Sequence, residues 1–199
     1  MILSWSLESK ERLFIHAGAV ANQSGAVLLL GPGGAGKSTT ALLCLQDGWK
    51  YIADDYCAID LAREPHVFSL YNSAKISQNW LNNVPQLKSL LPANSLMHGD
   101  KHIYFLEQTV RPRLVTSAAI RLLLLVHRRE RADTTVEPAS PAEALRAVGP
   151  STIFQTSASG AMFQNLAELV QRLPIRRLNL GADLEQIPLR IQQCLTSLA

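Results

Sequence analysis

Residues 31–38 read Gly-Pro-Gly-Gly-Ala-Gly-Lys-Ser, which is the spacing of a phosphate-binding (Walker A) loop. An apolar run at 26–30 precedes the loop, and Thr-Thr-Ala-Leu-Leu follows it at 39–43. The motif therefore sits between a buried strand and a helix, which is the context that a P-loop requires. The alternative, a glycine-rich turn that merely joins a strand to a helix, does not account for the lysine and serine. An α/β chain with a sheet behind this loop is expected.

In such a loop the backbone N–H groups point inward at phosphate oxygens, and the helix N-terminus adds partial positive charge. Lys37 is expected to reach the β- and γ-phosphates, and Ser38 is expected to offer its hydroxyl to Mg²⁺. ATP and Mg²⁺ are therefore the expected ligands. The predicted nucleotide-binding residues are Gly31, Gly33, Gly34, Ala35, Gly36, Lys37, Ser38 and Thr39.

The adjacent acids Asp54 and Asp55 follow the apolar Tyr51-Ile-Ala53. A helix over 37–47 descends about 16 Å at ~1.5 Å per residue. A strand over 50–54 climbs back roughly 16 Å at ~3.3 Å per residue, so both carboxylates return to the level of the phosphates. Because neighbouring strand residues point to opposite faces, the two are expected to do different work, one at Mg²⁺ and one as a general base. The alternative is a solvated strand end.

His16 is placed by pairing arithmetic. If residues 22–25 form a hairpin turn, Ala21 pairs with Ala26 and Val20 with Val27. His16 then lies opposite Gly31, where it could bond the γ-phosphate or a metal-bound water. A partly buried structural histidine is the equal alternative.

The remaining pattern interleaves strands and helices. Residues 130–139 are polar and contain proline, which predicts a loop. Between 69 and 91 the pattern predicts a short strand, a helix around 77–83 and a break at Pro85. Further strands are expected at about 12–21, 26–30, 50–60, 101–106, 118–127 and 175–180, and further helices at 37–47, 141–147, 160–173 and 183–198.

The 199 residues fit one domain, taken as 1–199, with 47% hydrophobic and 18% charged residues. A net charge of +3, gathered in short clusters, disfavours nucleic acid as a partner. The three cysteines are too scattered for a disulfide framework or a metal pair. No secretory signal or membrane-length apolar run is visible, so a cytoplasmic protein without a membrane partner is expected.

Three stretches together resemble the catalytic core of HPr kinase/phosphorylase and its smaller relatives. These are Phe-Ile-His-Ala-Gly-Ala-Val at 14–20, the loop with its strand at 27–38, and Gly-Trp-Lys-Tyr-Ile-Ala-Asp-Asp at 48–55. The resemblance covers about 45 residues well. It implies a P-loop kinase core with a mixed β-sheet, similar to that of phosphoenolpyruvate carboxykinase, and phosphoryl transfer from ATP to a serine hydroxyl.

By motif position the resemblance assigns catalysis to Asp55 as base, His16 and Lys37, and the metal to Ser38 and Asp54. It also raises the prospect of a homo-oligomer. The family's additional N-terminal domain and its downstream glutamate with Arg-Gly have no counterpart in these 199 residues, with Glu107 the nearest acid. HPr as substrate and phosphorylase activity are therefore not implied. The chain is more narrowly similar to kinases that phosphorylate a serine of lasso peptide precursors.

Extra positive charge on the moving phosphate would assist transfer. Lys75 and Lys101 are the preferred candidates, and Arg111, Arg113, Arg128 and Arg129 are further ones. Each is also explicable as a solvated surface charge. Three functions remain: a kinase acting on a serine of a peptide or small protein, a small-molecule kinase, and a nucleotide-binding regulatory ATPase.

Overall fold

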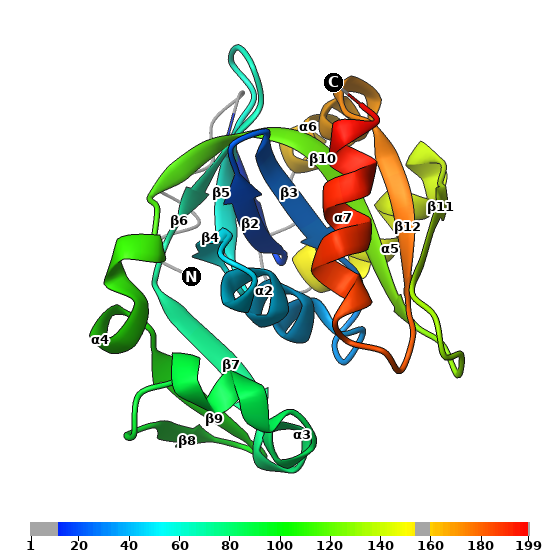
Figure 1. Ribbon diagram of the computed structural model, residues 1–199. Coiled ribbons are helices and arrows are strands. Elements are labelled where there is room, and N and C mark those ends of the chain that lie inside the picture. Colours follow the sequence, from blue (N-terminus) through cyan, green and yellow to red (C-terminus); the bar gives the residue numbers. More distant parts are fainter. Residues whose placement is uncertain (1–11, 154–159, 199) are drawn as a thin grey trace.

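The computed structural model describes residues 12–153 and 160–198. Its large mixed sheet runs in the order β1-β5-β6-β10-β3-β2-β4, and β12 pairs with β10 and with β11. Its strands are β1 (Arg12–Ile15), β2 (Gly18–Asn22), β3 (Gly25–Leu30), β4 (Lys50–Ala53), β5 (Cys57–Asp60), β6 (His66–Ser69), β10 (Ser117–Arg128), β11 (Thr135–Pro138) and β12 (Ile175–Leu180). A mixed α/β fold is thus confirmed (Figure 1).

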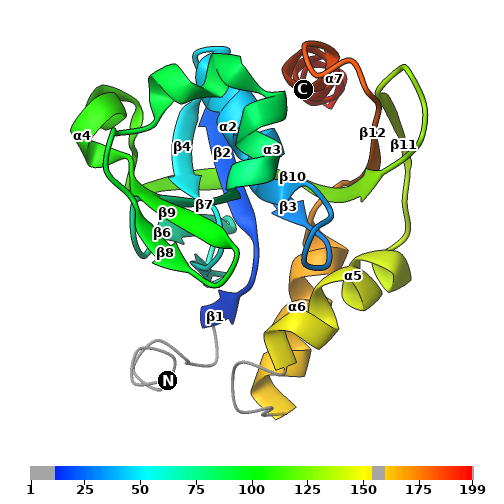
Figure 2. The same cartoon turned by 90° about the horizontal axis from the view of Figure 1, so that it is seen from below.

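Helices cover both faces of this sheet, as Figure 2 shows from below. On one face lie α2 (Lys37–Gln46) and α7 (Gln186–Thr196), packed with Leu29, Leu124 and Leu178. On the other lie α5 (Pro141–Ile153) and α6 (Gly160–Arg172), packed with Leu28 and Leu125. Neighbouring residues of β3 and β10 therefore enter different core layers, which explains why these strands are apolar throughout.

A second, three-stranded sheet has the order β7-β9-β8. It consists of β7 (Ser73–Ser77), β8 (Leu96–His98) and β9 (Lys101–Phe105), accompanied by α3 (Gln78–Asn83) and the 3₁₀ turn η1 (Pro85–Leu90). The short α4 (Glu107–Val110) and η2 (Arg111–Arg113) lead back to β10. In Figure 1 this sheet lies below α2.

The predicted hairpin register is confirmed: Ala21 pairs with Ala26 and Val20 with Val27. The pairing ends at Gly18 with Leu29, so the placement of His16 opposite Gly31 is wrong. The expected strand over 12–21 breaks at His16 and Ala17 because β1 turns away to pair with β5.

Three other boundaries differ from the expectation. The strand over 50–60 is split between β4 and β5 by the bend that carries both aspartates. The loop expected at 130–139 contains β11, which pairs with β12 at the sheet edge, where a terminal proline is tolerated. The helix expected at 141–147 continues to Ile153. The strands β6 and β8 were not predicted.

The direction of the strands decides where the site forms. β10 is parallel to both β3 and β12, and β4 and β3 are both antiparallel to β2. The carboxyl ends of β3, β4, β10 and β12 therefore meet at one edge of the sheet, and the start of β2 lies there too. Such an edge is where α/β proteins bind ligands.

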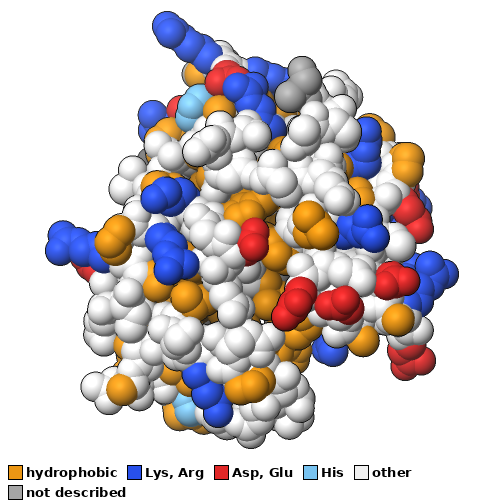
Figure 3. All heavy atoms as spheres, viewed as in Figure 1, with side chains coloured by type: hydrophobic (Ala, Val, Ile, Leu, Met, Phe, Trp, Pro, Cys, Tyr) orange, Lys and Arg blue, Asp and Glu red, His pale blue; other side chains and the backbone are white. Residues whose placement is uncertain are grey.

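Figure 3 shows the face on which α2 and α7 lie, with its Lys and Arg side chains separated by uncharged and acidic ones. No described helix combines the length and apolarity that crossing a membrane needs.

Candidate functional site

The phosphate loop between β3 and α2 depends on three glycines with positive φ for its shape. Gly31 has φ +148, Gly34 has φ +81, and Gly36, the N-cap of α2, has φ +107. A Cβ on Gly36 would lie 2.5 Å from Leu180 Cδ1, and one on Gly31 would lie 3.0 Å from the carbonyl oxygen of Val126. Gly33 has nothing within 4 Å of its Cβ position, so this side of the loop is open to a ligand.

Lys37 is buried against its own loop. Its Nζ donates to the carbonyl oxygens of Gly31 at 2.7 Å and of Pro32 at 3.1 Å. Burial lowers its pKa, while Asp54 and Asp55 act in the opposite direction. The ammonium is thus held at the mouth of the loop by two bonds, with both acids near enough to favour its charged form.

Asp54 is nearly inaccessible, with 2% of its surface exposed. One carboxylate oxygen, Oδ2, accepts the backbone N–H of Lys75 at 2.7 Å. Burial raises the pKa of Asp54 to about 6, although the nearby Ser38 hydroxyl and the Lys75 N–H lower it. Its other oxygen, Oδ1, is buried without a hydrogen-bond partner in the part of the chain that the structure describes.

That unpartnered oxygen tests whether a metal fits here. A buried carboxylate oxygen without a donor needs compensation, which a cation supplies. Mg²⁺ commonly takes one or two protein oxygens and completes its shell with phosphates and water. Ser38 and Asp54 offer that hard-oxygen donor set, and Asp54 lies close enough to Ser38 for the hydroxyl to influence its pKa. The pair therefore fits Mg²⁺ bound together with a nucleotide.

Asp55 occupies a different environment from its neighbour. A third of its side chain is exposed, and Oδ1 contacts Nε2 of His16 at 2.8 Å. Burial alone would raise the pKa of Asp55, but the bond and charge of His16, with Lys75 and Lys37, bring it below its ordinary value. The carboxylate is thus ionised at neutral pH and held in one orientation at the cleft.

Aromatic packing holds the histidine. The Tyr56 ring lies 5.2 Å from both Phe14 and His16, and it stacks on Phe14 with an interplanar angle of 11°. The sequence left His16 either at the γ-phosphate or in a structural role, and the structure places it against Asp55, in the cleft that the phosphate loop also lines. This contact forms because His16 lies in the break between β1 and β2, next to the bend after β4 that carries Asp55.

These residues line one cleft of about 1010 Å³. It brings together the predicted site residues His16, Gly33, Gly34, Gly36, Lys37, Ser38, Thr39, Asp54 and Asp55, with Lys75, Lys101, Arg128 and Arg129. Gly31 and Ala35 shape the loop but are not among the lining residues.

Two of the candidate arginines lie elsewhere. Arg113 Nη1 donates to the carbonyl oxygen of Leu45 at 2.7 Å, which caps the end of α2. Arg111 pairs with Glu107 at 3.6 Å, and both side chains are exposed. Neither arginine lines the cleft, so the expectation that these two could serve the phosphate is wrong.

Sequence reasoning proposed Arg128 and Arg129 but missed the rest of their wall of the cleft, which residues 130–132 and 180–187 form. The backbone N–H groups of Ala182 and Asp183 donate to the carbonyls of Arg131 and Ala132 at 2.8 and 3.1 Å. Gly181 permits this approach, since a Cβ there would lie 2.4 Å from the Ala132 oxygen. The signal that could have found this wall is that both segments follow the carboxyl ends of parallel strands.

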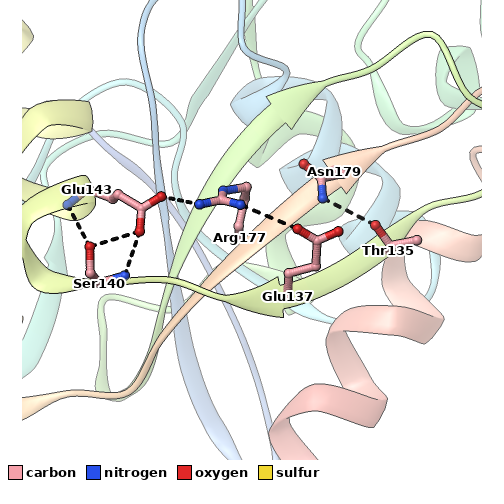
Figure 4. Close-up of polar contacts among 6 residues, drawn as sticks. All are labelled: Thr135, Glu137, Ser140, Glu143, Arg177 and Asn179. Carbon is pink, nitrogen blue, oxygen red and sulfur yellow. Dashed lines mark hydrogen bonds and ion pairs between the residues drawn. The ribbon is translucent and has the colours of Figure 1, made fainter.

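Polar contacts below this wall fix β12 to its neighbours (Figure 4). Arg177 on β12 bonds Glu143 at the start of α5 and Glu137 on β11. Asn179 Nδ2 donates to Thr135 Oγ1 at 3.2 Å. Bonds from the Ser140 N–H and hydroxyl, and from Arg177, lower the pKa of Glu143 to about 2. These contacts fix β12, whose carboxyl end leads into the cleft, to both β11 and α5.

The comparisons with known proteins speak to the fold. No family model matches the sequence, and no curated protein matches it either. Among solved structures, the chain is similar to the Hpr(Ser) kinase/phosphatase from Coxiella burnetii, with 10% identity and a TM-score of 0.51. The match covers 92% of this chain and 97% of that one. At this identity the likeness concerns architecture, and it confirms the expected kinase-like fold with a mixed sheet behind the P-loop.

Proposed function

We propose that this protein is an ATP-dependent kinase that transfers the γ-phosphate to a serine hydroxyl of a peptide or small protein, and that lasso peptide precursors are one such acceptor. The carrying observation is that two adjacent carboxylates beside one P-loop have separate environments. Asp54 is buried beside Ser38, whereas Asp55 is part-exposed in the cleft and bonded to His16. A base for an acceptor hydroxyl must be ionised and must reach the cleft, and Asp55 meets both conditions whereas Asp54 is buried beside Ser38.

In this proposal the triphosphate lies along the open side of Gly33 and Gly34, with its charge facing Lys37 and the N-terminus of α2. The nucleoside extends toward the wall at 180–187, where Leu184 and Ile187 offer apolar contact. Ser38 and Asp54 would hold Mg²⁺, which would neutralise negative charge on the phosphates. Lys75 and Lys101 line the same cleft and supply further positive charge.

The chemical step needs a positioned hydroxyl and an acceptor for its proton. The serine oxygen attacks the γ-phosphorus, the new O–P bond forms, and the bond from that phosphorus to the β,γ-bridging oxygen breaks, which releases ADP. The serine proton passes to the Asp55 carboxylate. His16 orients that carboxylate through Nε2. The lowered pKa of Asp55 keeps its carboxylate ionised at neutral pH, so that it can accept the proton.

The test is incubation with γ-labelled ATP, Mg²⁺ and a pool of synthetic serine peptides, followed by mass-spectrometric localisation of the phosphate. We expect phosphoserine from the wild type, and a rate lower by roughly 10²–10⁴ for Asp55→Asn, the usual worth of a general base. Asp47→Asn, an exposed position outside the cleft, is the matched control. ADP release at equal rates from wild type and Asp55→Asn, without any phosphopeptide, would instead indicate an ATPase.

A further inference from the structure

The three-stranded sheet has one buried face and one open face. Ala74, Ile76 and Tyr104 point into the core beneath α2 and α3. Because side chains alternate along a strand and cross-strand partners share a face, the opposite face is fixed by register. This open face consists of Ser73, Lys75, Ser77, Leu96, His98, Lys101, Ile103 and Phe105.

The open face is polar where it lines the cleft and apolar farther from it. Lys75, Lys101 and His98 line the cleft. Beyond them, Leu96 is 57% exposed and Phe105 46% exposed. Of the seven large hydrophobic side chains that are exposed among the described residues, two, Leu96 and Phe105, belong to this open face. A concentration of this kind beside a cleft marks an interaction surface.

The face is anchored directly to the proposed transfer site. The backbone N–H of Lys75 donates to Asp54, so β7 lies against the bend that also carries Asp55. Lys75, Ile103 and Leu96 are successive cross-strand partners. This row spans about 10 Å, two strand spacings, which an extended peptide covers in about three residues.

We propose that the open face holds the acceptor peptide in an extended conformation, with its serine at Asp55 and flanking apolar side chains against Leu96, Ile103 and Phe105. This inference rests on the proposed kinase function and adds a substrate preference to it. The occupant is a peptide because the apolar surface of Leu96, Ile103 and Phe105 lies next to the polar residues of this face that line the cleft, where the serine must enter. A free small molecule at Asp55 would not reach Leu96.

The experiment uses the full-length protein and a library of peptides with one fixed serine and randomised flanking positions. Two readouts are taken: retention of peptides on immobilised protein in the presence of ADP, and phosphate incorporation from ATP. Leu96→Thr and Phe105→Thr test the face. Met97→Thr, the neighbour on the opposite face of β8, and Phe68→Thr, an exposed phenylalanine on β6, are the matched controls. Thermal unfolding, ADP affinity and molar mass by light scattering are measured for every variant.

The wild type is expected to enrich peptides with Leu, Ile or Phe near the serine, and each test variant to reduce that enrichment roughly tenfold, as the loss of one apolar contact would. The controls are expected to retain it. Enrichment without phosphate transfer would support the docking face and overturn the kinase proposal. Phosphate transfer with no apolar preference would overturn the docking face alone. The absence of both enrichment and phosphate transfer would overturn both proposals. An equal loss of enrichment in the control variants would also overturn the docking face. A smaller molar mass only in the test variants would overturn it too, because the face would then bind a second copy of the chain.

Discussion

Replacing Asp54 by asparagine should stabilise the protein when metal and nucleotide are withheld. The carboxylate is buried, and burial raises its pKa from 3.8 to about 6. An acid whose pKa is raised on folding destabilises the folded state wherever it is ionised, because the unfolded chain gives up the proton more readily. The penalty is absent below the unfolded pKa, grows between pH 4 and 6, and is complete above that range.

The magnitude follows from the shift. A pKa raised from 3.8 to about 6 corresponds to roughly 3 kcal/mol at pH 8. For a chain of 199 residues this corresponds to a rise of roughly 6–12 °C in Tm for Asp54→Asn. The amide can still accept the N–H of Lys75, so the variant keeps the bond that positions β7.

The assay is thermal unfolding of wild type and Asp54→Asn in EDTA at pH 4, 5, 6, 7 and 8, with the exposed Asp100→Asn as control. The two proteins should have similar Tm at pH 4 and separate as the pH rises. Addition of Mg²⁺ with a non-hydrolysable ATP analogue should then stabilise the wild type more than the variant. A variant that is no more stable at pH 8, or a difference that does not change with pH, would refute the argument from burial.

Three further predictions concern stability. Gly36→Ala should lower Tm by several degrees, because a left-handed φ costs an alanine roughly 1–2 kcal/mol and its Cβ would meet Leu180, while Gly33→Ala should not; equal losses by differential scanning calorimetry would contradict this. Glu143→Gln should lower Tm at pH 7, and the gap to the wild type should close as pH falls from 4.5 toward 2, since the pKa of this acid is about 2 in the folded protein; a gap that persists in acid would argue against the proposed bonds. Arg113→Met should cost about 1–2 kcal/mol in urea unfolding through loss of the cap on α2, with phosphoryl transfer unchanged; a slower transfer would return this arginine to the site.

Local sequence signals were sufficient for the central elements of the site. The glycine spacing predicted a loop whose geometry depends on Gly31 and Gly36, and the turn at 22–25 predicted the hairpin register residue for residue. The lengths of the helix and of the strand after it predicted that Asp54 lies at the level of the loop. These inferences worked because each depends on contiguous residues and fixed rises per residue.

Contacts between distant segments escaped the same reasoning. Nothing in the pattern around residue 16 shows that β1 leaves its hairpin for β5, yet that departure is what brings His16 to Asp55. The sequence made Arg113 a candidate phosphate ligand because of its charge alone. Only the structure shows that its side chain caps the end of α2.

The sequence by itself predicted a strand–loop–helix unit with the spacing of a phosphate-binding loop, and it predicted that two carboxylates return to that loop. The sequence predicted different roles for these carboxylates, but only the tertiary structure decided their environments, because their partners come from β7 and from the break between β1 and β2 rather than from their own strand. The tertiary structure also decided that the small sheet presents Leu96 and Phe105 beside the cleft. Register across strands, which no short stretch of sequence encodes, sets which side chains share a face.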